Sequence, residues 1–161
     1  GLLNSMIKNI DGMVDVVRKI SSELRPSVLD DLGLVAAIEW LTKDFSERLG
    51  IDYDLNINCK EPDPNKARDT AVFRIYQEAL VNIARHSEAD FFWVDLRIVD
   101  NQLLLNIIDN GIGITISQLN DSRSIGLIGM KERATHVGGT IHVHNRDEGG
   151  VKVKLVVPIF I

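Results

Sequence analysis

A carboxylate and an amide stand four residues apart in the segment Phe73–His86, at Glu78 and Asn82. Residues with this spacing lie on one face of a helix, and Arg85 and His86 follow about one turn later. Carboxylate and amide oxygens suit a hydrated Mg²⁺, which prefers oxygen ligands and keeps several of its waters. The spacing therefore predicts a site for Mg²⁺ and its phosphates, although a solvated polar helix face would contain the same residues.

A second group of residues follows an apolar strand and reads Asp109-Asn110-Gly111-Ile112-Gly113. The two glycines allow the backbone to approach a ligand closely. Asp109 can accept a hydrogen bond from an amine, and the exocyclic amino group of adenine is such a donor. Taken alone, the same pattern is also that of an ordinary turn.

A third group contains Gly126 and Gly129 within the segment Ser122–Met130, where a helix is predicted to begin. The first turn of a helix has free N–H groups and the positive end of the helix dipole, which together bind phosphate. The Gly-Lys-Ser/Thr ending of a Walker A loop is missing. Ordinary helix capping would explain these glycines equally well.

The first 25 residues are predicted to form one helix, ended by Pro26 because proline disfavours helix in the residue before it. Its apolar residues alternate at spacings of three and four, which is the heptad pattern of a helix bundle. They are Leu3, Met6, Ile10, Met13, Val17, Ile20 and Leu24, with Ile7 and Val14 beside them. A single helix cannot bury such a stripe, so we expect a partner helix; packing on the chain's own domain is the alternative.

The remaining elements predict an α+β two-layer sandwich with a mixed, mostly antiparallel sheet. A second helix is expected over Ser27–Leu49, with an apolar face of Leu29, Leu32, Val35, Ile38, Leu41, Phe45 and Leu49. A third helix is expected over Ala67–His86, and a fourth ends at Val137. Alternation of apolar and polar residues predicts strands over residues 51–57, 91–99, 103–108, 140–145 and 151–157.

Composition restricts the function. The net charge of −5 argues against a nucleic-acid partner, which usually requires a basic face. A single cysteine, Cys59, excludes a disulfide framework and fits a reducing cytoplasm. No apolar run approaches the ~20 residues that span a bilayer. Because the chain begins with Gly1, we interpret it as a piece of a longer protein, whose other parts could include a membrane anchor.

Together, in this order and at these spacings, the three groups resemble the nucleotide-binding motifs shared by DNA gyrase, MutL-type repair proteins and histidine kinases. The region from Glu78 to His86 resembles the N box. The glycine boxes resemble Asp109–Gly113, Gly126–Gly129 and Gly149–Pro158. The similarity is greatest to sensor histidine kinases of the nitrate-sensor, DesK and LiaS branch. Three stretches indicate this branch: Glu23-Leu24-Arg25-Pro26 with the following Leu29–Leu34, Arg85-His86, and Gly126-Leu127-Ile128-Gly129-Met130-Lys131-Glu132-Arg133.

The resemblance implies a Bergerat-type ATP-binding fold over residues 26–161, preceded at 1–25 by the last helix of a truncated dimerisation bundle. It implies that Asn82 ligates Mg²⁺, that Glu78 orients a metal-bound water and that Asp109 binds the adenine amino group. The other residues implied to bind ATP are Arg85, His86, Gly111, Gly113, Gly126, Leu127, Gly129 and Met130. A lid over about residues 117–125 would cover the phosphates. The implied partners are ATP, a response regulator and a second copy joined through the bundle.

The family's phosphoacceptor is a histidine followed by an acidic residue. The four histidines here are His86, His136, His142 and His144, and none has such a neighbour. The resemblance therefore implies a kinase fragment that lacks its acceptor. Val151 stands where the family often has threonine, which leaves a water-mediated adenine contact there in doubt. Two alternatives remain: a serine kinase of the anti-sigma-factor type, and a non-catalytic nucleotide-sensing module.

Overall fold

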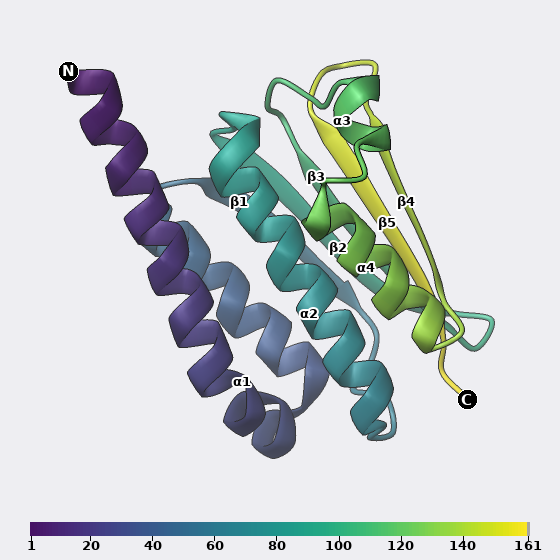
Figure 1. Cartoon of the computed structure of the whole chain (residues 1–161). Helices are drawn as coiled ribbons and strands as arrows, with labels where there is room; N and C mark the ends of the chain where they lie inside the picture. The colour runs from purple at the N-terminus through teal and green to yellow at the C-terminus, as the bar shows by residue number, and fades with distance from the viewer. Residues whose placement is uncertain (161) are drawn as a thin grey trace.

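Helices cover one face of a five-stranded sheet whose strand order is β1-β2-β3-β5-β4 (Figure 1). The computed structural model describes residues 1–12 and 27–160. The strands are β1 (Asp52–Asn58), β2 (Phe91–Val99), β3 (Gln102–Asp109), β4 (Thr140–Asn145) and β5 (Val151–Pro158). β1 pairs in parallel with β2, and the other neighbours are antiparallel. The predicted α+β sandwich with a mostly antiparallel sheet is confirmed.

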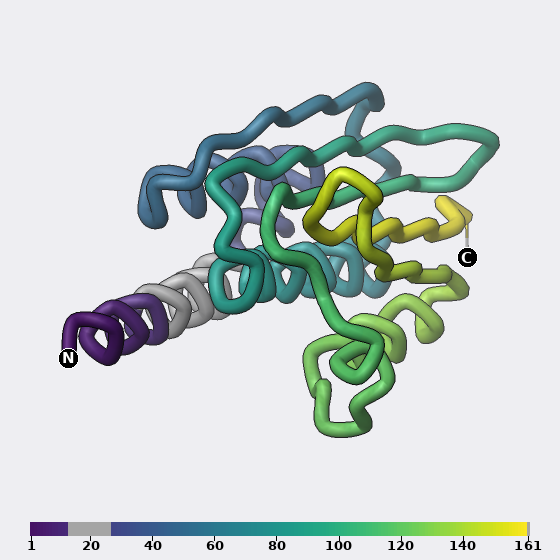
Figure 2. The backbone as a smooth tube through the Cα atoms, turned by 90° about the horizontal axis from the view of Figure 1, so that it is seen from above, coloured from purple at the N-terminus to yellow at the C-terminus, as the bar shows by residue number. Residues whose placement is uncertain are grey.

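The helical layer contains α1 (Leu2–Leu49), α2 (Lys66–Asn82), the one-turn π-helix η1 (Ile83–Ser87), α3 (Ile116–Asn120) and α4 (Ile125–His136). Viewed from above, α2 and α4 lie on the same side of the strands (Figure 2). The core lies between the layers and includes Phe45 of α1, Tyr76 of α2, Phe92 of β2 and Met130 of α4, all fully buried. Burial of these large side chains is the main force that holds α2 and α4 on the sheet.

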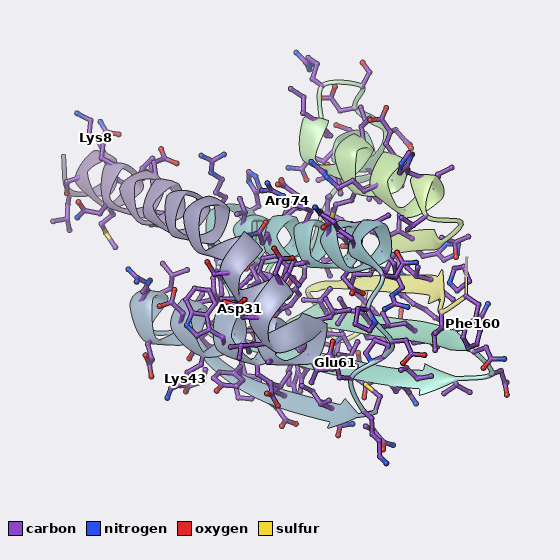
Figure 3. All side chains as sticks on the ribbon, turned by 90° about the horizontal axis from the view of Figure 1, so that it is seen from below. Lys8, Asp31, Lys43, Glu61, Arg74 and Phe160 are labelled. Atoms are coloured by element: carbon purple, nitrogen blue, oxygen red, sulfur yellow. The ribbon has the colours of Figure 1, made fainter. Side chains whose placement is uncertain are left out.

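A break at Gly33 interrupts α1, where the sequence predicts one continuous helix from Ser27 to Leu49. Gly33 has φ 87° and ψ 176°, a conformation that favours glycine. The Glu61 carboxylate, labelled in Figure 3, accepts hydrogen bonds from the N–H groups of Leu34 and Val35 and so caps the helix that restarts there. The break also corrects the predicted apolar face, because Leu32 is 63% exposed and Leu34 is fully buried instead.

The N-terminal part of α1 exposes its apolar stripe. The exposed fractions of Leu3, Met6 and Ile10 are 74%, 55% and 39%. The rest of the predicted heptad pattern, and the helix end predicted at Pro26, fall among residues 13–26 and lie outside the described residues. Among the helices of the described ranges, none is long and apolar enough to cross a membrane.

Candidate functional site

The last turns of α2 present Glu78 and Asn82 side by side, as their spacing predicts. Asn65 caps the start of this helix by accepting from the Arg68 N–H at 2.9 Å, and the buried face of α2 fixes its rotation on the sheet. Glu78 and Asn82 are half-buried, and neither side chain has a hydrogen-bond partner within the described ranges. Two unpartnered oxygen donors on one helix face fit a hydrated Mg²⁺.

The α-helix predicted to reach His86 ends instead at Asn82, and one π-helical turn follows. Ser87 accounts for this turn: its hydroxyl donates to the Ile83 carbonyl at 2.6 Å and accepts from the Ala89 N–H at 3.0 Å. Such side-chain bonds to the backbone compete with regular helical bonding, and single π-turns occur often at functional sites. The two residues before Ser87 lie within this turn.

Those two residues, Arg85 and His86, are both exposed on η1. The Arg85 guanidinium lies 3.7 Å from the Asp11 carboxylate of α1. An exposed ion pair of this kind contributes little to stability, so Arg85 can exchange Asp11 for another anion at small cost.

Asp109 ends β3 and is 5% exposed. Its Oδ1 accepts hydrogen bonds from the N–H groups of Gly111 at 2.9 Å and Val151 at 3.4 Å. Burial raises the pKa of Asp109, while these two bonds and the charge of Arg146 act in the opposite direction. The second carboxylate oxygen, Oδ2, has no partner in the part of the chain that the structure describes. A fixed carboxylate with one free oxygen is suited to accept a hydrogen bond from an amine.

The glycines after Asp109 allow close packing of backbone segments. A Cβ on Gly111 would overlap the carbonyl oxygen of Ser87, which accepts from the Ile112 N–H at 2.7 Å. At Gly113 a Cβ would lie 2.8 Å from Oδ1 of Asn145, whose amide also pairs with the backbone of Ile114. These contacts join the end of β3 to η1 on one side and to the end of β4 on the other.

The predicted lid contains a short helix that the sequence analysis missed. Thr115 and Gln118 form a reciprocal capping box at the start of α3, which the Thr-x-x-Gln spacing could have indicated. A turn held by Asp121 and Ser124 then leads into α4.

At the start of α4, a predicted phosphate-binding glycine lies next to a predicted metal-binding residue of α2. A Cβ on Gly126 would overlap Oε1 of Glu78, so this glycine leaves room for the carboxylate. The N–H groups of Gly126 and Leu127 have no bonded partner within the described residues, as phosphate binding requires. Gly129 follows one turn later. The side chain of Met130 lies in the core and that of Leu127 is partly buried against it, so the nucleotide contacts predicted for them would be made by main-chain atoms.

These contacts place the predicted residues at one end of the fold, at the top of Figure 1, where α2 and β3 end and α4 begins. Three residues of this end were missed: Ser87, Asn145 and Arg146. Ser87 holds the π-turn in place, and Asn145 and Arg146 make their contacts from the end of β4 and the β4–β5 turn. Neither turn has a strong sequence pattern.

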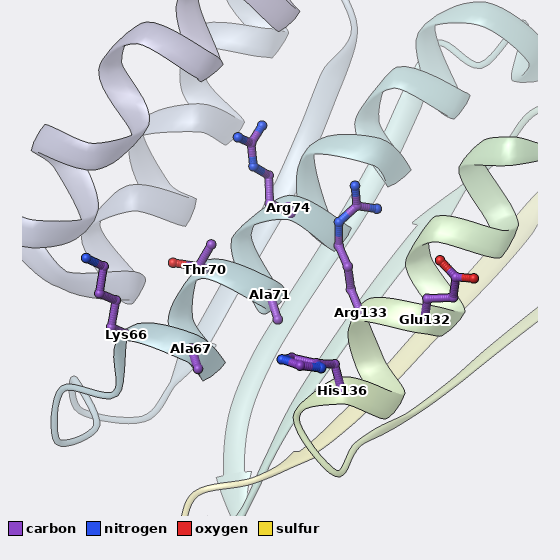
Figure 4. A pocket seen from close by; sticks show the side chains of 8 residues that line it. All are labelled: Lys66, Ala67, Thr70, Ala71, Arg74, Glu132, Arg133 and His136. Carbon is purple, nitrogen blue, oxygen red and sulfur yellow. The ribbon is translucent and has the colours of Figure 1, made fainter.

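A separate open groove of about 730 Å³ lies between α2 and α4 (Figure 4). Its lining residues are Lys66, Ala67, Thr70, Ala71, Arg74, Glu132, Arg133 and His136. The groove borders the N-terminal half of α2, whereas Glu78 and Asn82 belong to the other half, so it is distinct from the predicted nucleotide site.

Comparison with solved structures supports the fold. The histidine kinase domain of the blue-light activated histidine kinase from Erythrobacter litoralis EL346 superposes with a TM-score of 0.64 at 14% identity, covering 96% of this chain and 94% of that one. Full-length ShkA in complex with AMPPNP gives 0.62 at 15% identity, covering 78% of this chain and 29% of that one. At these identities the likeness concerns the fold alone.

Sequence comparison goes further. The oxygen sensor histidine kinase NreB of Staphylococcus carnosus (strain TM300) is 36% identical over 156 residues, which are 94% of this chain and 45% of that protein. The chain thus spans less than half the length of this relative. A family model described as histidine kinase-, DNA gyrase B- and HSP90-like ATPase matches residues 67–160, the stretch that contains Glu78, Asp109 and Gly126. The chain therefore belongs to the family of histidine kinase-, DNA gyrase B- and HSP90-like ATPases.

Proposed function

We propose that this chain is the catalytic ATP-binding region of a sensor histidine kinase, working in the cytoplasm. The main support for this proposal is the geometry of Asp109: two backbone N–H groups hold Oδ1, while Oδ2 stays free. The free oxygen would accept the 6-amino group of adenine. Similarity to NreB, which is named an oxygen sensor histidine kinase, supports a histidine as the phosphoryl acceptor.

The metal site would use oxygen donors of α2. In this proposal Asn82 ligates Mg²⁺ directly and Glu78 holds one of its waters, because both oxygens are unpartnered and on the same face. Mg²⁺ supplies charge neutralisation of the phosphates. The free N–H groups of Gly126 and Leu127 would bind the phosphates, and the Arg85 guanidinium would add a positive charge after leaving Asp11.

The protein's part in the transfer is to position the γ-phosphoryl group and stabilise its charge, since little covalent chemistry is left to the enzyme. The acceptor would be a histidine outside this chain. Each histidine present lacks an acidic neighbour, and His142 and His144 lie on the exposed face of the edge strand β4. A response-regulator aspartate would receive the phosphoryl group afterwards.

Residues 1–25 would belong to the dimerisation bundle of the whole protein. The exposed stripe of Leu3, Met6 and Ile10 supports this assignment, because apolar stripes of this kind are usually covered by another helix. A second copy of the protein would supply that cover. The serine kinase alternative is disfavoured, since the relatives described above are histidine kinases.

Phosphotransfer in trans tests the proposal. The chain is incubated with Mg²⁺ and γ-labelled ATP, alone and with a separate bundle fragment of the parent protein that contains its acceptor histidine. We expect no label on this chain and acid-labile label on the added fragment. Asn82→Ala should abolish the transfer, while the control Asn58→Ala, an exposed asparagine on β1, should leave it unchanged.

Two outcomes contradict the proposal. Nucleotide binding without label on the fragment would favour a non-catalytic nucleotide-sensing module. Acid-labile label on the chain alone, lost in His86→Gln, would make His86 an acceptor instead of a binding residue.

A further inference from the structure

The turn between β4 and β5 packs directly on Asp109. A Cβ on Gly150 would overlap the Asp109 carbonyl oxygen, so only glycine allows this approach. The Arg146 guanidinium bonds both sides of this contact: its Nη1 donates to the carbonyl oxygens of Asp109 at 3.2 Å and Gly149 at 3.3 Å. One side chain thus ties the end of β3 to the turn that faces it.

Two further contacts hold Arg146 in place. Its Cζ lies 5.2 Å from the centre of the Trp93 ring on β2, a cation–π distance. Its Nη2 lies 3.3 Å from Oε2 of Glu148, and the side chain is 22% exposed. A guanidinium whose Nη1 donates to two carbonyl oxygens, whose Nη2 pairs with a carboxylate and whose face lies on an aromatic ring has few other orientations open to it.

We propose that Arg146 is the positioning residue for Asp109: it holds the Asp109 main chain against the β4–β5 turn, and its charge keeps the carboxylate a hydrogen-bond acceptor, so that the site selects adenine over 6-oxopurine bases. This inference deepens the proposed function and rests on the base contact that the proposal assigns to Asp109.

The charges around Asp109 support this role. Burial raises the pKa of Asp109, and the Arg146 charge is the cationic contribution that opposes it. Glu148 pairs with Arg146, and Asp90 accepts from the side-chain amide of Asn110, the residue after Asp109, at 2.6 Å. On the neighbouring strand β2, the residue opposite Asp109 is Phe92, which is apolar and has no charge. On η1, the titratable residue is His86, which precedes Ser87.

The two protonation states of Asp109 recognise different bases. An ionised carboxylate accepts from the 6-amino group of adenine and repels the 6-oxo group of hypoxanthine. A protonated carboxyl can donate to that 6-oxo group. Loss of Arg146 should therefore weaken ATP binding relative to inosine triphosphate, and more strongly as the pH falls.

The test measures the Asp109 carboxyl directly and then the base selectivity. Carboxyl ¹³C resonances of the nucleotide-free chain are titrated by NMR, and the Asp109 signal is assigned by its absence in Asp109→Asn. In Arg146→Met the titration midpoint of the Asp109 carboxyl should move to higher pH, because the positive charge that opposes the effect of burial is lost. The ratio of ATP to inosine triphosphate affinity, measured by calorimetry at pH 6, should fall about three- to tenfold.

Controls separate positioning from folding. Arg146→Lys keeps the charge and should return the midpoint toward that of the unmodified chain. Arg97→Met, an exposed arginine on the same sheet that pairs with Asp95, should change neither midpoint nor ratio. Glu148 has a 77% exposed side chain, so Glu148→Gln should fold normally even where Arg146→Met does not. Because it leaves the Arg146 charge uncompensated, it should move the midpoint to lower pH.

The inference is overturned if Arg146→Met and Glu148→Gln leave the midpoint and the affinity ratio unchanged. It is also overturned if Arg146→Met weakens both nucleotides equally, which is the result of a purely structural role. Failure of the proposed base contact would look different: Asp109→Asn would then leave the affinity for ATP unchanged, whatever the variants of Arg146 do.

Discussion

Asp109→Asn should make the nucleotide-free chain more stable and a poor nucleotide binder at the same time. Asparagine keeps the shape, and its Oδ1 can still accept from Gly111 and Val151. Its NH₂ group replaces the free Oδ2, so a donor would face the adenine amino group. Losing a hydrogen bond to a charged group costs about 1.5–3 kcal/mol, which corresponds to roughly ten- to a hundredfold in affinity.

The stability change has the opposite sign because burial raises the pKa of Asp109. The folded protein then holds the proton more tightly than the unfolded chain does. The contribution of Asp109 to stability is therefore fully present below its unfolded pKa and is lost as the pH rises through its folded pKa. At pH 7 the ionised carboxylate destabilises the fold, so asparagine should raise the melting temperature, and the difference should shrink as the pH falls toward the unfolded pKa of about 3.9. In a domain of this size, 1 kcal/mol corresponds to about 2–4 °C.

Calorimetric titration with ADP and Mg·ATP measures the affinity, and circular dichroism melts from pH 4 to pH 8 measure the stability. The control Asp54→Asn changes an exposed aspartate on β1 and should alter neither. Unchanged affinity in Asp109→Asn would remove Asp109 from adenine recognition. A lower melting temperature at pH 7 would refute the electrostatic reasoning.

Three further predictions concern the metal site, the start of α4 and the break in α1. Asn82→Ala should weaken ATP binding in Mg²⁺ much more than in EDTA, and equal losses in calorimetry would make Asn82 a structural residue. Gly126→Ala should leave the melting temperature nearly unchanged, because the Glu78 carboxylate can move aside, yet reduce phosphotransfer about ten- to a hundredfold; unaltered transfer would separate Glu78 from the chemistry. Glu61→Ala should lose the helix cap and about 0.5–2 kcal/mol in urea unfolding, whereas the exposed Glu39→Ala should lose almost none.

The sheet could be predicted from the sequence because alternation is local. Phe92, Val94 and Leu96 point inward between the polar or half-exposed residues of β2, and the predicted bounds of this strand match those observed. Asp100 and Asn101 adopt positive φ of 50° and 60°, which fits the tight turn predicted between β2 and β3. Residues close together in sequence determine such elements.

The break in α1 could not be predicted in this way. An apolar residue at every third or fourth position from Leu29 to Leu49 indicates an unbroken helix, and glycine alone lowers helix propensity by only about 1 kcal/mol. The break depends on Glu61, which caps Leu34 from 27 residues further along the chain. The same holds for η1, whose last residue Ser87 contacts the backbone beside Gly111.

The candidate site also contains residues that local sequence indicates and residues that only distant contacts explain. Glu78, Asp109 and Gly126 could be proposed as site residues from the sequence because their positions on a helix, at a strand end and at a helix start already suggest chemistry. Arg146 could not, since a charged turn of Arg146-Asp147-Glu148 indicates only solvent exposure. Its role depends on Trp93, 53 positions earlier in the sequence, and on the close approach that Gly150 permits. The residues proposed to contact the nucleotide can thus be recognised from a family's motif, whereas the residues proposed to hold them in place depend on which strands this particular chain packs together.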